Sequence, residues 1–117
     1  MEIQKIEFEE DMCRGTRMIN PKENLAGVYL LFNEKMELVY IGQTTYLRNR
    51  IWAHVSKNNN GRNPDAVKGD TDYSSKLKLG EACFFSFIEV FSKCERDMVE
   101  RMLIFYLNPT LNRPSHS

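Results

Sequence analysis

The stretch GVYLLFNEKMELVYIGQTTYLRNRIWAHV, residues 27–55, decides the fold that this chain can adopt. It begins with two runs rich in β-branched and aromatic residues, 27–32 and 37–42, separated by the turn-prone residues NEKM. Such residues fit the half-buried surface of a pleated sheet, and turn-formers between two such runs indicate that the runs pair. The sequence therefore predicts a β-hairpin over residues 27–42.

The two tyrosines of this hairpin are predicted to lie on one face of the sheet. A four-residue loop over 33–36 sets Phe32 opposite Glu37. In that register Tyr29 lies directly opposite Tyr40, within side-chain reach. Any loop with an even number of residues keeps both rings on one face, whereas an odd number separates them, because side chains alternate along a strand. The pair is either ordinary aromatic packing or part of a site.

The hairpin leads directly into an amphipathic helix. Thr44 or Thr45 can cap its first turn, and the helical pattern extends to about Ser56. Apolar residues at every fourth position predict its buried face: Leu47, Ile51 and Val55. Arg50 and His54 are also four residues apart, so we expect them to present a guanidinium and an imidazole along an adjacent face.

A strand and a second helix are predicted toward the C-terminus. Residues 57–82 are rich in Asn, Gly, Lys and Asp, which predicts a long loop or a loop with a short helix. The run ACFFSFIEVF, residues 82–91, is typical of a buried strand. Ser92 and Glu95 form a capping box at the start of the next helix, which is expected to end at Asn108, before a proline.

This last helix carries a broad apolar face, which predicts that it is deeply packed. The apolar positions are Met98, Val99, Met102, Leu103, Ile104 and Phe105. Glu100 interrupts them, one turn from Leu103 and Ile104. Its carboxylate lies either at the solvated edge of the helix or in a cleft.

Composition indicates a soluble protein of one domain. A chain of 117 residues with 42% apolar and 27% charged residues suits one compact core. No apolar run reaches the roughly 18–20 residues of a membrane span, and the acidic start is unlike a signal peptide. Three widely spaced cysteines, Cys13, Cys83 and Cys94, favour reduced thiols in the cytoplasm over a disulfide framework or a zinc site.

A net charge of zero hides a basic middle of the chain. No acidic residue occurs from Leu38 to Pro64. The basic side chains of this region are Arg48, Arg50, His54, Lys57 and Arg62. Such a region can bind a phosphate backbone, or it can be a solvated surface.

The order of these motifs resembles the GIY-YIG nuclease family. The two tripeptides appear as GVY at 27–29 and YIG at 40–42, with Val28 where Ile is commoner in the family. The other family positions are matched, in order and at family spacing, by Arg50, His54, Glu100 and Asn112. The resemblance covers about residues 25–113.

This resemblance implies a small α/β (α+β) fold in which helices flank a three-stranded antiparallel sheet. It divides the chain into a polar lead-in at 1–24, a nuclease domain at 25–113 and a tail at 114–117. It also implies DNA as the substrate and Mg²⁺, or Mn²⁺, as the metal, with no other small-molecule cofactor and no membrane. The oligomeric state stays open.

The resemblance further implies roles for single residues. The catalytic set is Tyr29, Tyr40, Arg50, His54 and Glu100, with Glu100 also the metal ligand. Arg48, Lys57, Arg62 and Asn112 are expected to contact the substrate, although Asn112 can instead fix the backbone of the site. The resemblance implies a tyrosine as the general base, with a slight preference for Tyr40 over Tyr29. Because a phenol with a reference pKa of about 10 is a poor base at neutral pH, His54 remains the other candidate.

Two other functions compete with a metal-dependent endonuclease. One is a module on the same fold that binds nucleic acid without cutting it. The other is a protein-interaction adaptor that uses the acidic residues within 1–20.

For the endonuclease, a single active site in one small domain favours nicking of one DNA strand or weak sequence specificity. The predicted loop at 57–82 can carry the substrate preference.

Overall fold

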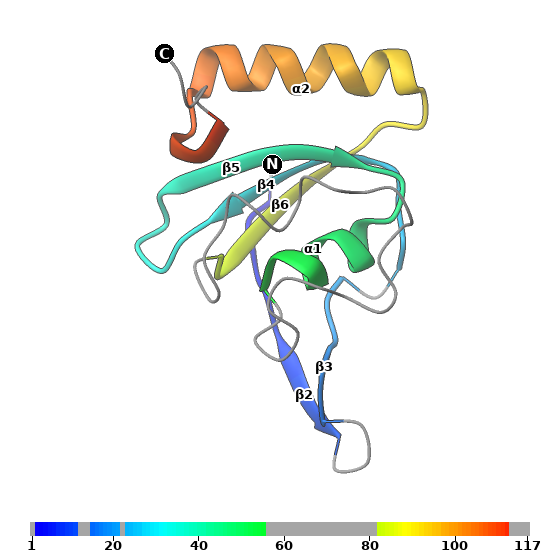
Figure 1. Ribbon diagram of the computed structural model, residues 1–117, viewed down its shortest axis with the longest axis vertical. Helices are drawn as coiled ribbons and strands as arrows, with labels where there is room; N and C mark the ends of the chain where they lie inside the picture. The colour runs from blue at the N-terminus through cyan, green and yellow to red at the C-terminus, as the bar shows by residue number, and fades with distance from the viewer. Residues whose placement is uncertain (1, 12–14, 22, 56–81, 113–117) are drawn as a thin grey trace.

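The computed structural model describes residues 2–11, 15–21, 23–55 and 82–112. Its centre is a four-stranded antiparallel sheet in the order β1-β6-β4-β5 (Figure 1). The strands of this sheet are β1 (Gln4–Lys5), β4 (Gly27–Phe32), β5 (Leu38–Thr44) and β6 (Phe84–Glu89). A separate hairpin joins β2 (Phe8–Asp11) to β3 (Gly15–Met18). The helices are α1 (Leu47–Val55), α2 (Lys93–Leu107) and a short 3₁₀ turn, η1 (Thr110–Asn112).

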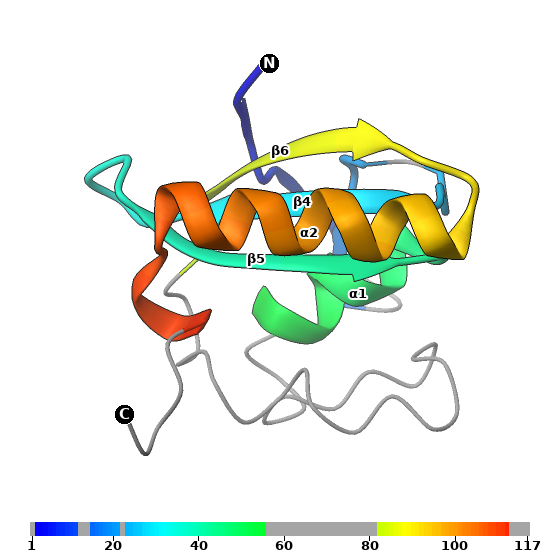
Figure 2. The ribbon, with the colours of Figure 1, turned by 90° about the horizontal axis from the view of Figure 1, so that it is seen from above.

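The sheet lies between the two helices, with α2 over one face and α1 over the other (Figures 1 and 2). Alternation along the central strand β4 therefore serves two cores. Val28 and Leu30 point toward α2, where they pack with Val99, Leu103 and Ile104. Tyr29 and Leu31 point toward α1, where they pack with Leu47 and Ile51. The predicted class, an antiparallel sheet flanked by helices, is confirmed.

The predicted register of the hairpin is wrong, but Tyr29 and Tyr40 still lie on the same face of the sheet. Phe32 pairs with Leu38, which leaves a five-residue loop at 33–37. An odd loop would place the two rings on opposite faces, but the register shifts between Leu31 and Phe32. This β-bulge adds one residue to β5 and restores the alternation. Tyr29 then lies opposite Gly42, while Tyr40 pairs with Leu31.

Helix α1 begins later than the sequence predicts. The strand β5 continues through Thr44, whose hydroxyl accepts a hydrogen bond from the backbone N–H of Tyr46 at 2.9 Å. The first helical N–H, that of Leu47, donates to the carbonyl of Leu25 at 3.1 Å. Leu47 and Ile51 are buried, as predicted. The expected last residue, Ser56, and all but the final residue of the loop predicted at 57–82 lie outside the described residues.

The ends of α2 are as predicted, but its packing is not. The Ser92 hydroxyl accepts from the backbone N–H of Glu95 at 3.4 Å, and Asn108 ends the helix in the left-handed conformation. Only one side of α2 meets the sheet, so the helix is not deeply packed. Met98, Met102 and Phe105 lie on its outer side and are 55%, 52% and 80% exposed.

The N-terminal residues contribute more structure than their sequence predicts. The two residues of β1 pair with β6 and widen the expected three-stranded sheet to four strands. Ile6 follows directly and is 5% exposed in the α1-side core. A strand of two residues shows no alternation, so no sequence pattern could indicate it. Within the described part of the chain, neither helix has the length and apolarity needed to cross a bilayer.

Two glycines of the sequence motifs lie where no side chain fits. A Cβ atom on Gly27 would come within 2.0 Å of the carbonyl oxygen of Ile88 on β6. A Cβ atom on Gly42 would come within 2.5 Å of the Tyr29 hydroxyl and 2.9 Å of the Tyr40 ring. The first glycine therefore permits close approach of two strands, and the second makes room for the tyrosine pair.

We expect Gly27→Ala to lower the free energy of unfolding by about 1–3 kcal/mol, because the obstructing atom is backbone and two strands must move apart. Urea unfolding at neutral pH measures the loss. Lys35→Ala, in the exposed hairpin turn, is the control and should change stability by less than about 0.5 kcal/mol. Equal stability of Gly27→Ala and the unmodified protein would contradict the close approach.

Candidate active site

Three predicted site residues meet between the sheet and α1. Tyr29 on β4, Tyr40 on β5 and His54 on α1 form an aromatic cluster. Their ring centroids are 6.1 Å apart for the two tyrosines, 5.8 Å for Tyr29 and His54, and 5.2 Å for Tyr40 and His54. The Tyr29 hydroxyl and His54 Nε2 share a hydrogen bond of 3.0 Å. Tyr29 and His54, which are 25 positions apart in the sequence, thus form a hydrogen bond inside the aromatic cluster.

His54 does not lie on an outer face of α1, contrary to the prediction. It is 3% exposed, because it follows Ile51 by three residues and a helix returns to nearly the same side in that distance. Burial, with a smaller contribution from the charge of Arg50, lowers the pKa of His54 to about 3. The imidazole is therefore neutral at physiological pH. Within the described residues, its Nδ1 atom has no hydrogen-bond partner.

The exposed fractions divide this cluster into an inner and an outer part. Tyr29 is 1% exposed, so its hydroxyl is sealed against His54. Tyr40 is half-buried, and Arg50 on α1 is half-buried as well. Tyr40 is therefore more accessible to solvent than Tyr29. Arg48, on the same helix, is also half-buried.

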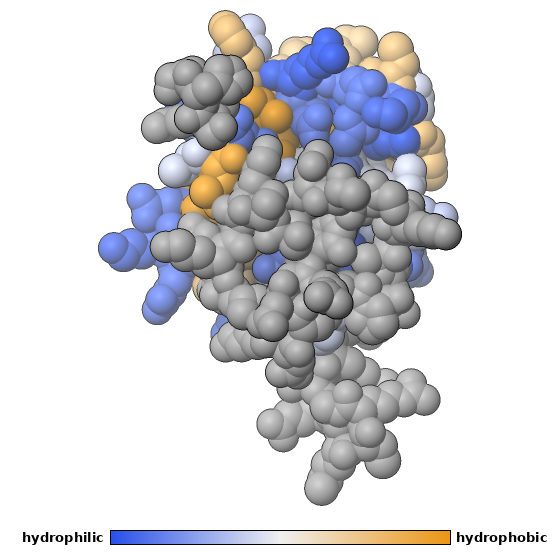
Figure 3. Space-filling model, viewed as in Figure 1, coloured by the Kyte–Doolittle hydropathy of each residue, from blue (hydrophilic) through white to orange (hydrophobic). Residues whose placement is uncertain are grey.

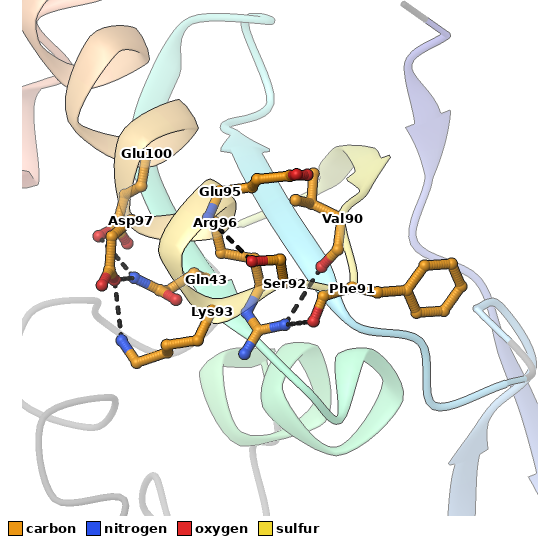
Figure 4. A network of polar contacts seen from close by, with 9 residues as sticks. All are labelled: Gln43, Val90, Phe91, Ser92, Lys93, Glu95, Arg96, Asp97 and Glu100. Atoms are coloured by element: carbon orange, nitrogen blue, oxygen red, sulfur yellow. Dashed lines mark hydrogen bonds and ion pairs between the residues drawn. The ribbon is translucent and has the colours of Figure 1, made fainter.

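A polar network lies on the other face of the sheet, at the end of β5 (Figure 4). Gln43 follows Gly42, so alternation along β5 turns its side chain toward α2. Its Nε2 atom donates to Asp97 Oδ1 and, at 3.3 Å, to Glu100 Oε1. Asp97 also accepts from Lys93 Nζ at 2.8 Å. One amide group therefore holds two carboxylates that lie three residues apart on α2.

The two carboxylates have opposite electrostatic environments. The pKa of Asp97 is lowered by the hydrogen bonds from Lys93 and Gln43. Burial raises the pKa of Glu100; the hydrogen bond from Gln43 opposes this shift, and the smaller effect of the Asp97 charge adds to it. Lys93 thus neutralises Asp97, whereas Glu100 makes no ion pair within the described part of the chain. A cation beside Glu100 would relieve this unfavourable charge.

These residues fit a hard divalent cation held by one carboxylate. Magnesium binds oxygen ligands and typically keeps several of its waters, so one protein carboxylate with a phosphate suffices. Among the residues that the structure describes, no group of three or more His, Cys, Asp or Glu side chains could hold a metal. Glu100 is half-buried at the network and makes one long hydrogen bond, which leaves most of its oxygen lone pairs for a ligand.

Arg96 anchors the start of the helix that carries Glu100. Its Nη1 atom donates to the carbonyls of Val90 at 3.2 Å and Phe91 at 2.5 Å (Figure 4). Arg96 is 6% exposed, so this cation is buried beneath the loop between β6 and α2. This contact fixes the start of α2 relative to the end of β6. It therefore also fixes how far Glu100 lies from the sheet.

Asn112 fixes the outer edge of the sheet. Its Oδ1 atom accepts from the backbone N–H of Ile41, and its Nδ2 atom donates to the carbonyl of the same residue, both at 2.7 Å. Ile41 lies on the edge strand β5, between Tyr40 and Gly42. The amide of Asn112 thus takes the place of a neighbouring strand. Its expected contact with substrate stays a prediction.

Sequence reasoning missed Gln43 and Asp97. Alternation along β5 was a sufficient signal for Gln43, because it places residue 43 on the face opposite Gly42. Spacing on α2 was a sufficient signal for Asp97, three residues before Glu100. The two remaining expected substrate contacts, Lys57 and Arg62, lie outside the described residues.

Comparison with known families agrees with this arrangement. The family model of the GIY-YIG catalytic domain matches residues 25–109. The matched region runs from just before β4 to just after α2 and contains both sides of the site. Asn112 lies just beyond it, and the strands β1–β3 precede it. No curated protein matches the chain.

Burial of His54 makes the stability of the protein depend on acidity. The unfolded chain binds a proton at His54 below its ordinary pKa of 6.5, but the folded protein does so only near 3. Stability is therefore fully present above pH 6.5 and falls as the pH drops. We expect this one residue to cost up to about 2 kcal/mol between pH 6.5 and 5, at 1.36 kcal/mol for each pH unit.

Urea unfolding at pH 7 and pH 5 measures this effect as the difference between the protein and His54→Gln, which should lose less stability on acidification. His116→Gln removes the only other histidine and is the matched control. It should behave as the unmodified protein does. An identical loss of stability in all three proteins would refute the burial of a neutral His54.

Asp97→Asn should lower the pKa of Glu100. The substitution removes a neighbouring negative charge and leaves Gln43 and Lys93 to act on Glu100, and all three effects favour its ionised form. A pH titration followed by NMR of the side-chain carboxyl carbons measures the shift. Glu95→Gln, a charge change on the exposed side of the same helix, should leave the Glu100 titration in place. A raised Glu100 pKa in Asp97→Asn would contradict the network.

Proposed function

Because this chain belongs to the GIY-YIG family, a family of nucleases, we propose that it is a divalent-metal-dependent endonuclease that hydrolyses phosphodiester bonds in DNA. One observation carries the proposal: consecutive residues of β5 adjoin the two halves of the site. The backbone of Gly42 lies beneath the Tyr29 hydroxyl, and the side chain of Gln43 bonds to Glu100. The aromatic cluster and the carboxylate network therefore contact the same end of β5 from its two faces.

Glu100 is the proposed metal ligand, with Mg²⁺ or Mn²⁺ as the ion. When bound, the cation supplies charge neutralisation at a phosphate oxygen and lowers the pKa of a bound water. Glu100 suits this task because its charge is uncompensated within the described residues, whereas Lys93 already pairs with Asp97. Gln43 orients the Glu100 carboxylate from the sheet side.

Tyr40 is the proposed general base, or the group that orients the attacking water. It is the only member of the aromatic cluster with substantial exposure, because Tyr29 and His54 are 1% and 3% exposed. A phenol must lose its proton to act as a base, and a nearby cation favours the phenolate. Arg50 can supply that charge and can also hold phosphate oxygens with its planar guanidinium.

His54 and Tyr29 are proposed to support the site instead of attacking substrate. A histidine with a pKa of about 3 is neutral and, at 3% exposure, hardly reaches a solvent proton. Its hydrogen bond with Tyr29 fixes the ring against which Tyr40 packs. Both residues therefore position Tyr40, which the motifs alone favoured only slightly as the general base.

The remaining parts of the proposal concern substrate and location. Arg48, Lys57 and Arg62 are proposed to contact the DNA backbone, with Asn112 holding the edge strand. One active site in each chain favours cutting one strand at a time. The spacing of the three cysteines is consistent with a cytoplasmic protein.

Supercoiled plasmid incubated with Mg²⁺ or Mn²⁺ tests this function, and nicking converts it to the relaxed form. We expect Glu100→Gln and Tyr40→Phe to reduce the rate by about 10²–10⁴-fold, the usual contribution of a positioned catalytic group. Glu34→Gln, in the exposed hairpin turn, should retain the full rate, and a chelator should abolish cleavage.

Three other outcomes contradict parts of the proposal. Equal cleavage by Glu100→Gln would reject Glu100 as the metal ligand. If Tyr40→Phe keeps full cleavage activity and His54→Gln loses it, His54 and not Tyr40 is the general base. Salt-dependent DNA binding without cleavage of plasmid or branched DNA would favour the non-catalytic binding module.

A further inference from the structure

The outer side of α2 exposes a stripe of large apolar side chains. We call Met98, Met102, Phe105 and Tyr106 the α2 stripe; they are 55%, 52%, 80% and 75% exposed. The rings of Phe105 and Tyr106 pack edge to face, with centroids 5.3 Å apart. Figure 2 looks directly onto this side of α2, and no described element lies over it. Apolar surface also gathers along the α2 edge of the molecule in Figure 3.

The stripe is separate from the side of α2 that forms the core. Met98, Met102 and Phe105 follow the spacing i, i+4, i+7, which places them on one straight face of a helix. Val99, Leu103 and Ile104 pack against the sheet instead. The helix therefore has two apolar faces, of which the fold of one chain uses only one.

The area of the stripe suits the centre of an interface. At these exposures, two aromatic and two methionine side chains present roughly 500–600 Å², the upper end for the largest patch on a monomer. A standard interface buries about 800 Å² on each partner. Contacts by the neighbouring turns would supply the difference. Glu95 and Arg101 flank the stripe on its two sides, which gives an apolar centre with a polar rim.

We propose that the α2 stripe binds the same stripe of a second copy of this chain, with the two α2 helices antiparallel. The two-fold axis crosses the helix pair at the level of residue 100. Met98 of each copy then lies opposite Met102 of the other, so this contact occurs twice. Methionine adapts its shape readily, so opposed pairs fill the space between two helical ridges. In this arrangement Phe105 of each copy covers the turn around Glu95 of the other.

Charge favours a second copy over other partners. None of the four side chains in the stripe is charged, so a nucleic acid or a strongly charged protein meets no counter-charge there. The chain has a formal net charge of zero, so two copies do not repel one another as wholes. A non-polar surface on a neutral molecule is most readily covered by an identical surface.

Pairing through the stripe leaves the candidate active site open. Glu100 follows Met98 by two residues, which is a rotation of about 200° around the helix axis. Its carboxylate therefore faces the sheet and Gln43, away from the partner. The dimer would carry two sites, each with access to DNA. The proposal does not depend on the nuclease function, because assembly is measured without substrate.

Sedimentation equilibrium of the full chain over a range of micromolar concentrations tests the proposal. We expect a reversible dimer, and at least tenfold weaker association in the double variant M98E/M102E, because a glutamate buried in an apolar interface is unpaired. Phe91→Glu is the matched control, since Phe91 is 77% exposed but lies before the helix, outside the stripe. It should dimerise as the unmodified protein does, and circular dichroism checks that all variants are folded.

Cross-linking tests the antiparallel arrangement separately. Arg101 lies next to the proposed two-fold axis, so R101C in a C94S background should form a disulfide-linked dimer under mild oxidation, whereas C94S alone should not. A monomer at every concentration would overturn the proposal, including the case in which another protein or segment covers the stripe. A dimer that persists in M98E/M102E, or R101C that cross-links no better than C94S, would also overturn it.

Discussion

The pairing of β5 with β4 is the constraint on which the rest of the structure depends. A bulge between the hairpin turn and Tyr40 adds one residue to β5 and changes which side chains face each core. With the bulge, Tyr29 and Tyr40 share the α1 side, Gly42 leaves room for both rings, and Gln43 faces α2. A slip of one residue would turn all of these side chains to the wrong face. Asn112 reinforces this edge by accepting from the backbone N–H of Ile41 and donating to the carbonyl of the same residue.

Burial distributes the chemical roles within the site. The same aromatic packing that holds His54 against Tyr29 removes its positive charge, because an imidazolium is costly to desolvate. Glu100 is half-buried beside a second carboxylate, burial raises its pKa, and it makes no ion pair among the described residues. A neutral imidazole therefore lies on one side of β5, and a carboxylate with a raised pKa lies on the other. Both follow from the position of each side chain in the sandwich.

Sequence patterns predicted the elements well where local signals are strong. The hairpin, the strand before α2 and the caps at Ser92 and Asn108 follow from composition and turn chemistry, and all are present. The bulge, the two-residue strand β1 and the late start of α1 leave no periodic signal, so the register and the number of strands were wrong. The prediction that α2 is deeply packed was wrong, because helical spacing cannot distinguish an apolar face that packs within the chain from one that stays exposed.

The sequence by itself determined the family motifs, their order, and the residue types that the proposed chemistry needs: two tyrosines, an arginine, a histidine and a glutamate. Tertiary structure decided which of these reach solvent. His54 and Tyr29 are sealed, whereas Tyr40, Arg50 and Glu100 are half-buried. It also brought in Gln43 and Asp97, whose relevance depends on contacts between β5 and α2. The physical reason is that residue identity fixes what a group can do, whereas its pKa and its accessibility depend on neighbours distant along the chain.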